Sequence, residues 1–132
     1  SMDHYGFQKL VEQIPVELLN SVAVWGGEGV LPALKKEIPN IHCFSARSGK
    51  LKTADMIKNP LVLIWAAPRT PEVQFPQSIY PDWNPQIILD LNYTDHSLGI
   101  ECAKKYHCKY VSGLVMFLEQ ARYQREFWKE NL

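Results

Sequence analysis

The sequence of 132 residues is short of cysteine, of net charge and of long apolar runs. Its three cysteines, Cys43, Cys102 and Cys108, are odd in number and lack C-x-x-C spacing, which suits reduced thiols in a cytoplasm better than a disulfide framework. His107 beside Cys108 is one pair of potential ligands without a second pair, so no metal site is predicted. Fourteen basic and fourteen acidic side chains cancel, which leaves no electrostatic case for binding nucleic acid or an anionic membrane.

Long apolar segments are also missing. No run approaches the roughly 20 residues that a membrane-spanning helix needs, and no signal peptide is visible at the start. Hydrophobic residues make up 46% of the chain and charged residues 21%, which is the composition of an ordinary globular protein. We therefore expect a single globular domain over residues 1–132.

The apolar pattern alternates between short continuous runs and segments with helical spacing. The runs predict buried strands, and the spacing of three to four residues predicts helices. Prolines at five positions between residues 68 and 85 exclude a long regular element there. The expected strands are 22–25, 41–45, 61–65, 86–91 and 109–111, and the expected helices are 3–14, 30–38, 53–58, 95–106 and 112–129, with a short turn of helix at 16–19.

Alternating strands and helices indicate an α/β fold with a mostly parallel sheet and helices on both faces. Because crossovers between parallel strands are right-handed, few arrangements remain, and we expect five strands in the order 2-1-3-4-5. Ligands of such sheets bind beyond the carboxyl ends of the strands, beside the first strand. The site is therefore expected at that edge.

A glycine-rich turn follows the first expected strand. Gly26, Gly27 and Gly29 allow the backbone to turn sharply and allow a pyrophosphate to approach the start of the next helix. Glu28 stands where the fingerprint of dinucleotide-binding turns has a second glycine, and its charge would repel a phosphate unless its side chain points away. By itself this turn fits a bare connection between strand and helix equally well.

Motifs at both ends of the chain resemble those of shikimate dehydrogenases. D-L-N-Y-T-D from Asp90 and G-L-V-M-F-L-E-Q-A from Gly113 are similar to that family's D-x-x-Y-N-P and G-L-x-M-L-x-x-Q-A. D-H-Y-G-F from Asp3 is similar to the segment N-T-D-x-x-G-F/L that leads into the nucleotide-binding domain. In the middle of the chain, S-A-R-S from residue 45 and W-A-A-P from residue 65 are similar to N-R-T/S and N-A-T-P.

The resemblance implies a Rossmann-like, three-layer domain that is cut from a longer protein and lacks the preceding substrate domain. The whole protein would reduce 3-dehydroshikimate to shikimate with NADPH in aromatic amino acid biosynthesis, and the isolated chain would be inactive. Its substrate would be shared with the missing domain, whose lysine would pair with the catalytic aspartate. The implied site residues are Asp3 (catalytic), Tyr93 and Gln120 (substrate), and Gly26, Gly27, Gly29, Arg47, Ser48, Ala67, Gly113 and Met116 (NADP).

The chain departs from the family where the adenosine half of the cofactor binds. Ala46 and Trp65 replace polar residues, and only thirteen residues separate Arg47 from Leu61, where the family has a further helix and strand. The sequence therefore predicts a reduced form of the full dinucleotide fold. It also leaves open a second hypothesis, a docking or structural module that no longer binds dinucleotide.

Overall fold

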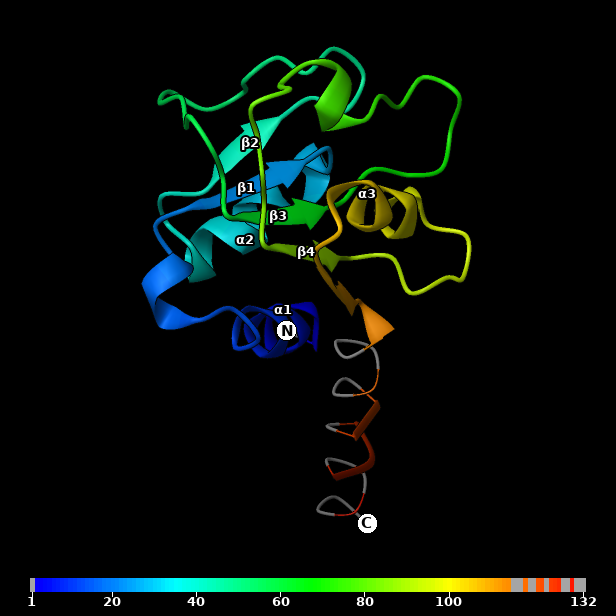
Figure 1. The fold of residues 1–132 in the computed structure, drawn as a ribbon. Coiled ribbons are helices and arrows are strands. Elements are labelled where there is room, and N and C mark those ends of the chain that lie inside the picture. The colour runs from blue at the N-terminus through cyan, green and yellow to red at the C-terminus, as the bar shows by residue number, and fades with distance from the viewer. Residues whose placement is uncertain (1, 115–117, 119–120, 123, 127–128, 130–132) are drawn as a thin grey trace.

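The computed structural model describes residues 2–114, 118, 121, 122, 124–126 and 129. Within them, five strands form one parallel sheet in the order β2-β1-β3-β4-β5, as the sequence predicted (Figure 1). The elements in chain order are α1 (Met2–Val11), η1 (Val16–Leu18), β1 (Val22–Trp25), η2 (Glu28–Val30), α2 (Leu31–Glu37), β2 (His42–Phe44), β3 (Val62–Trp65), η3 (Pro76–Ser78), β4 (Ile87–Asp90), α3 (Leu98–Tyr106) and β5 (Lys109–Ser112).

The sheet lies between two layers. Figure 1 shows α1 and α3 on opposite sides of it. On the α1 side, Val22 and Val24 of β1 pack in one apolar core with side chains of α1 and α2, among them Leu10 and Leu34. On the α3 side, part of the covering layer is not a helix but the connection between β3 and β4. Residues 69–85 of this connection are called the strap below.

The strap packs on the sheet through aromatic rings. Trp25 at the end of β1 is fully buried, and its ring centroid lies 5.9 Å from that of Trp83 and 6.3 Å from that of Tyr80. The rings of Tyr80 and Trp83 stack at 4.3 Å, and Phe44 of β2 lies 4.9 Å from Trp83. Aromatic pairs of this kind contribute roughly 0.5–1.5 kcal/mol each beyond their buried area. The strap is therefore a fixed part of the core.

The helix predicted for residues 53–58 is wrong, because that segment is bound to the edge of the sheet. The hydroxyl of Thr53, which would have capped the helix, instead accepts a hydrogen bond from the N–H of Cys43 at 3.3 Å. The N–H of Lys52 donates to the Cys43 carbonyl at 2.7 Å, and the carbonyl of Asp55 lies 2.7 Å from Nδ1 of His42. These contacts cover the open edge of β2, which would otherwise expose unpaired backbone groups.

Two other helix boundaries differ from the prediction by three residues, and α2 is one residue shorter at each end than predicted. α1 ends at Val11, three residues early, and Pro15 follows soon after. α3 begins at Leu98 and not at residue 95, because the hydroxyl of Ser97 caps it by accepting a hydrogen bond from the N–H of Gly99 at 3.1 Å. The predicted helix 112–129 lies largely outside the described residues. No helix among those described has the length and apolar character that crossing a membrane requires.

Candidate functional site

The turns after β1 and β3 touch each other at the carboxyl edge of the sheet. Gly26 and Gly27 both have left-handed backbone, with φ of +79° and +73°. A Cβ on Gly27 would lie 2.4 Å from the Cβ of Ala66, and one on Gly26 would lie 3.1 Å from the Cα of Ala67. Only glycine therefore fits both the conformation and the space.

The next part of this turn is open. A Cβ on Gly29 would meet no atom within 4 Å. The carboxylate of Glu28 lies 3.5 Å from the ammonium of Lys52, in the segment after β2, so its charge has a partner of opposite sign. This pairing lessens the repulsion that the sequence predicts between Glu28 and a phosphate. The start of α2 is a weaker phosphate-binding position than the helix start of a dinucleotide-binding turn, because α2 has only seven residues and follows a 3-10 turn.

A buried carboxylate links the other strand ends. Asp90, at the end of β4, is fully buried. Its Oδ2 accepts a hydrogen bond from the hydroxyl of Tyr110 at 2.7 Å, and its Oδ1 accepts bonds from the N–H and the side-chain amide of Asn92 at 2.9 and 3.2 Å. The same amide donates to the carbonyl of Ala67 at 3.1 Å and lies 3.4 Å from the hydroxyl of Ser97. This hydrogen-bond network therefore joins four parts of the fold, which are the turn after β3, the turn after β4, strand β5 and the start of α3.

The turn after β5 also packs against the end of β4. A Cβ on Gly113 would lie 2.6 Å from the carbonyl oxygen of Asp90 and 2.7 Å from that of Leu91, so this turn packs directly on the end of β4. Tyr93, in the loop between β4 and α3, is 55% exposed. No role was predicted for Asp90 or Asn92 from the sequence. In the sequence, Asp90 is a charged residue directly after a β-branched run. A half-buried strand end explains this pattern as well as a functional site does.

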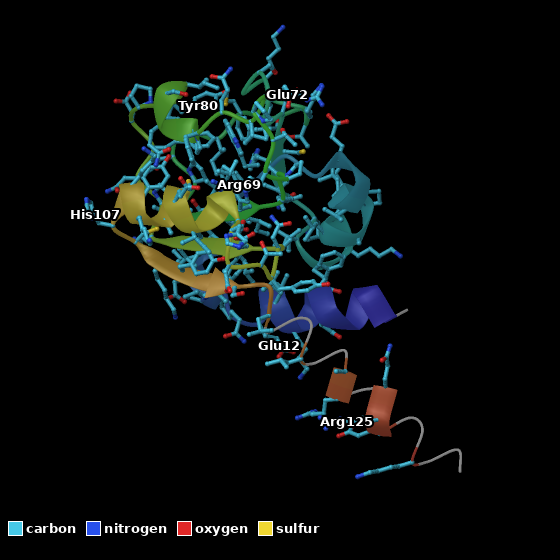
Figure 2. The ribbon with its side chains drawn as sticks, turned by 90° about the vertical axis from the view of Figure 1, so that its right-hand side faces the viewer. Glu12, Arg69, Glu72, Tyr80, His107 and Arg125 are labelled. Carbon is cyan, nitrogen blue, oxygen red and sulfur yellow. The ribbon has the colours of Figure 1, made fainter. Side chains whose placement is uncertain are left out.

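The loop after β2 carries the two remaining cofactor candidates. The hydroxyl of Ser45 accepts bonds from the N–H groups of Arg47 and Ser48, both at 3.3 Å, and fixes the turn. The side chains of Arg47 and Ser48 are exposed. The pKa of Glu72 on the strap is lowered by hydrogen bonds from its own N–H and from Thr70, with a smaller contribution from the Arg47 guanidinium. Figure 2 shows Glu72 and Tyr80 on the strap, at the side of the molecule away from α1.

The structure therefore places the predicted residues in two groups. Gly26, Gly27 and Ala67 lie in touching turns at the carboxyl ends of β1 and β3, with Gly29 beside them, and Gly113 lies after β5, against the end of β4. Arg47 and Ser48 lie on the loop after β2, the next strand along the sheet. The backbone of Asp3 is in α1; its side chain, together with all of Met116 and Gln120, lies outside what the structure describes. The roles of these residues stay predictions.

The fold is expected to lose stability as the pH rises above about 9. Burial raises the pKa of the Cys102 thiol from 9.0 to about 12. Burial, followed by the hydrogen bond with Asp90, also raises the pKa of the Tyr110 hydroxyl. Both groups hold their protons more tightly in the folded chain. Their contribution is thus complete below the unfolded pKa values and is lost as the pH rises through the folded ones.

Urea unfolding at about pH 7, 9 and 11 measures this loss. Cys102→Ala removes one of the groups whose pKa is raised, so the fall above pH 9 should become shallower in that variant. A free energy of unfolding that stays constant over this range would contradict the assignment.

No model of a protein family matches the chain, and no curated protein does either. Solved structures match over nearly its whole length. Shikimate dehydrogenase 1 from Peptoclostridium difficile is 21% identical, with a TM-score of 0.67, and the match covers 98% of this chain and 55% of that one. A chorismate mutase/shikimate 5-dehydrogenase fusion protein from Clostridium acetobutylicum is 20% identical, with a TM-score of 0.64 and coverages of 98% and 54%. Shikimate dehydrogenase from Thermotoga maritima is 16% identical, with a TM-score of 0.60 and coverages of 98% and 58%.

At these identities the likeness establishes the fold. The chain has the Rossmann-like α/β fold found in about half the length of each of these shikimate dehydrogenases. The solved structures with this fold are thus shikimate dehydrogenases, the family that the sequence motifs resemble.

Proposed function

We propose that this chain is the dinucleotide-binding domain of a shikimate dehydrogenase-like oxidoreductase. The single observation that carries the proposal is the structural match to shikimate dehydrogenases over 98% of the chain. The chain spans only about half of those proteins, so we also propose a preceding substrate domain in the same polypeptide. We propose a cytoplasmic location because three cysteines without disulfide spacing suit a reducing compartment.

The carboxyl edge fits part of a nicotinamide dinucleotide. The turn at Gly26 and Gly27 has the tight geometry that such turns need, Gly29 leaves room for close approach, and the charge of Glu28 is paired with Lys52. Arg47 is exposed on the loop after β2, where dinucleotide folds hold the adenosine ribose. A guanidinium there suits a 2′-phosphate, which favours NADP(H) over NAD(H).

A bound nicotinamide would supply the hydride that reduces the carbonyl of 3-dehydroshikimate. The chain's own part is to position the reactants and move a proton. Tyr93 and Gln120 would hold substrate hydroxyls, because a phenol and an amide both donate and accept hydrogen bonds. Asp3 would share the proton of the reacting hydroxyl with a lysine from the preceding domain. The isolated chain holds only half of this pair and is therefore inactive.

Arg47→Ser is expected to weaken NADPH binding by roughly 10-fold to 100-fold and to leave NADH binding unchanged. The change removes charge-assisted hydrogen bonds to one phosphate, worth about 1.5–3 kcal/mol. Calorimetric titration of the chain with each cofactor measures both constants. Arg69→Ser is the matched control, since Arg69 is also an exposed arginine but pairs with Glu101 at 2.8 Å.

An equal loss of both cofactors in Arg47→Ser would show that this arginine does not read the 2′-phosphate. If the unsubstituted chain binds neither cofactor at millimolar concentration, the proposed function fails. The chain would then be the docking or structural module that the sequence left open.

A further inference from the structure

The strap occupies the space between the ends of β1 and β2. The N–H of Gln74 donates to the carbonyl of Ala46 at 2.8 Å, and its side-chain amide donates to the carbonyl of Arg47 at 3.0 Å. Its own carbonyl accepts a hydrogen bond from the indole N–H of Trp25 at 2.9 Å. Gln74 therefore joins the end of β1 to the loop after β2, where the adenosine end of a dinucleotide belongs.

Further along the strap, Ile79 and Tyr80 also contact the loop after β2. The hydroxyl of Tyr80 donates to the carbonyl of Gly49 at 2.5 Å, and a Cβ on Gly49 would lie 2.5 Å from Cδ1 of Ile79. Tyr80 stacks on Trp83, which is 4% exposed. Opening this space for a ligand would break the aromatic core, so the strap is not a lid that a cofactor displaces.

The opposite wall of an adenine pocket is missing from the described residues. A full dinucleotide-binding sheet has one more strand beyond β2, whereas β2 is the edge of this sheet. The segment after the loop covers that edge through the bridge between Phe44 and Leu51 and the bonds of Lys52 and Thr53 to Cys43. Between the strap and this segment, most backbone groups of the loop are hydrogen-bonded, and its exposed residues are Arg47, Ser48 and Lys50.

Taking the proposed function as its premise, we infer that the site binds its dinucleotide without an enclosed adenine pocket. Arg47 on the outer rim contacts the ribose phosphate, and the adenine base lies in solvent outside the strap. The site therefore distinguishes phosphorylated from unphosphorylated cofactors but does not distinguish the base. Dinucleotides with another purine in place of adenine are ligands of the same strength.

The test compares three oxidised cofactors on the unsubstituted chain by calorimetry. They are NADP⁺, its analogue with hypoxanthine in place of adenine, and its analogue with 1,N6-ethenoadenine. All three dissociation constants are expected to agree within about twofold, since a base in solvent makes no contact to lose. Arg47→Ser should weaken all three by the same factor.

A second readout does not depend on affinity. The ethenoadenine base is fluorescent, and its quenching by acrylamide reports its exposure to solvent. When the cofactor is saturated with the chain, the bimolecular constant for quenching of the base by acrylamide is expected to remain that of the free cofactor. Shielding of the base, or a loss of tenfold or more for either analogue, overturns the inference while leaving the proposed function intact, because NADP⁺ still binds. Absence of binding by all three cofactors overturns both.

Discussion

Asp90→Ala is expected to lower the free energy of unfolding by about 3–5 kcal/mol, among the largest effects of any single substitution in this chain. The alanine removes the acceptor of three hydrogen bonds in a fully buried place. The hydroxyl of Tyr110 and the N–H of Asn92, both partly buried, would lose their partner, and leaving such a group unsatisfied costs about 1–3 kcal/mol. Urea unfolding followed by tryptophan fluorescence measures the change.

Two milder substitutions separate the network from simple packing. Asp90→Asn keeps the shape and one acceptor oxygen, and Tyr110→Phe removes a single donor. Each should cost less than Asp90→Ala, and in Asp90→Asn the pKa of Tyr110 should fall because the carboxylate that helps to raise it is gone. A loss below about 1 kcal/mol in Asp90→Ala would mean that this carboxylate does not hold the strand ends together.

Gly27→Ala is expected to destabilise the fold by about 2–5 kcal/mol. A non-glycine residue in the left-handed region costs about 1–2 kcal/mol, and the new Cβ would lie 2.4 Å from that of Ala66, which adds an overpacking cost of about 1–3 kcal/mol. Thermal and urea unfolding give the difference directly. The turn after β1 should move away from the turn after β3, so cofactor binding should weaken as well.

Gly29→Ala is the matched control, two residues away in the same turn. Its backbone is not left-handed and its Cβ position is empty within 4 Å, so its stability should stay within about 0.5 kcal/mol of the unsubstituted chain. Equal losses in Gly27→Ala and Gly29→Ala would contradict the packing described for the two turns.

The sheet was predictable because its strands are buried on both faces. Parallel strands of this kind appear as continuous apolar runs, and β1 was predicted with its observed bounds, 22–25. The strand order then followed from handedness and short connections, and it is confirmed. Gly26 and Gly27 of the first turn were identifiable because a left-handed, crowded backbone requires glycine, whereas the positions of Gly29 and its Cβ impose no such requirement.

Long-range contacts explain what the sequence did not predict. Thr53 has the pattern of a helix cap, but its hydroxyl is used by the edge of β2, ten residues earlier in the chain. Asp90 meets Tyr110 across twenty residues, and Gln74 meets Trp25 across forty-nine. Local spacing carries no sign of such pairs, since they depend on which strand ends the fold brings together. For the same reason, the packing of the strap on the α3 side of the sheet could not be predicted from the sequence.

The most direct test of the account is to map NADPH binding on the amides of the isotope-labelled chain by two-dimensional NMR. If the chain is a dinucleotide-binding domain, saturable shifts should gather at Gly26, Gly27, Gly29, Ala67 and Gly113, with Arg47 responding to NADPH and not to NADH. Shifts confined to the amino ends of the strands, or no shifts at millimolar cofactor, would contradict it.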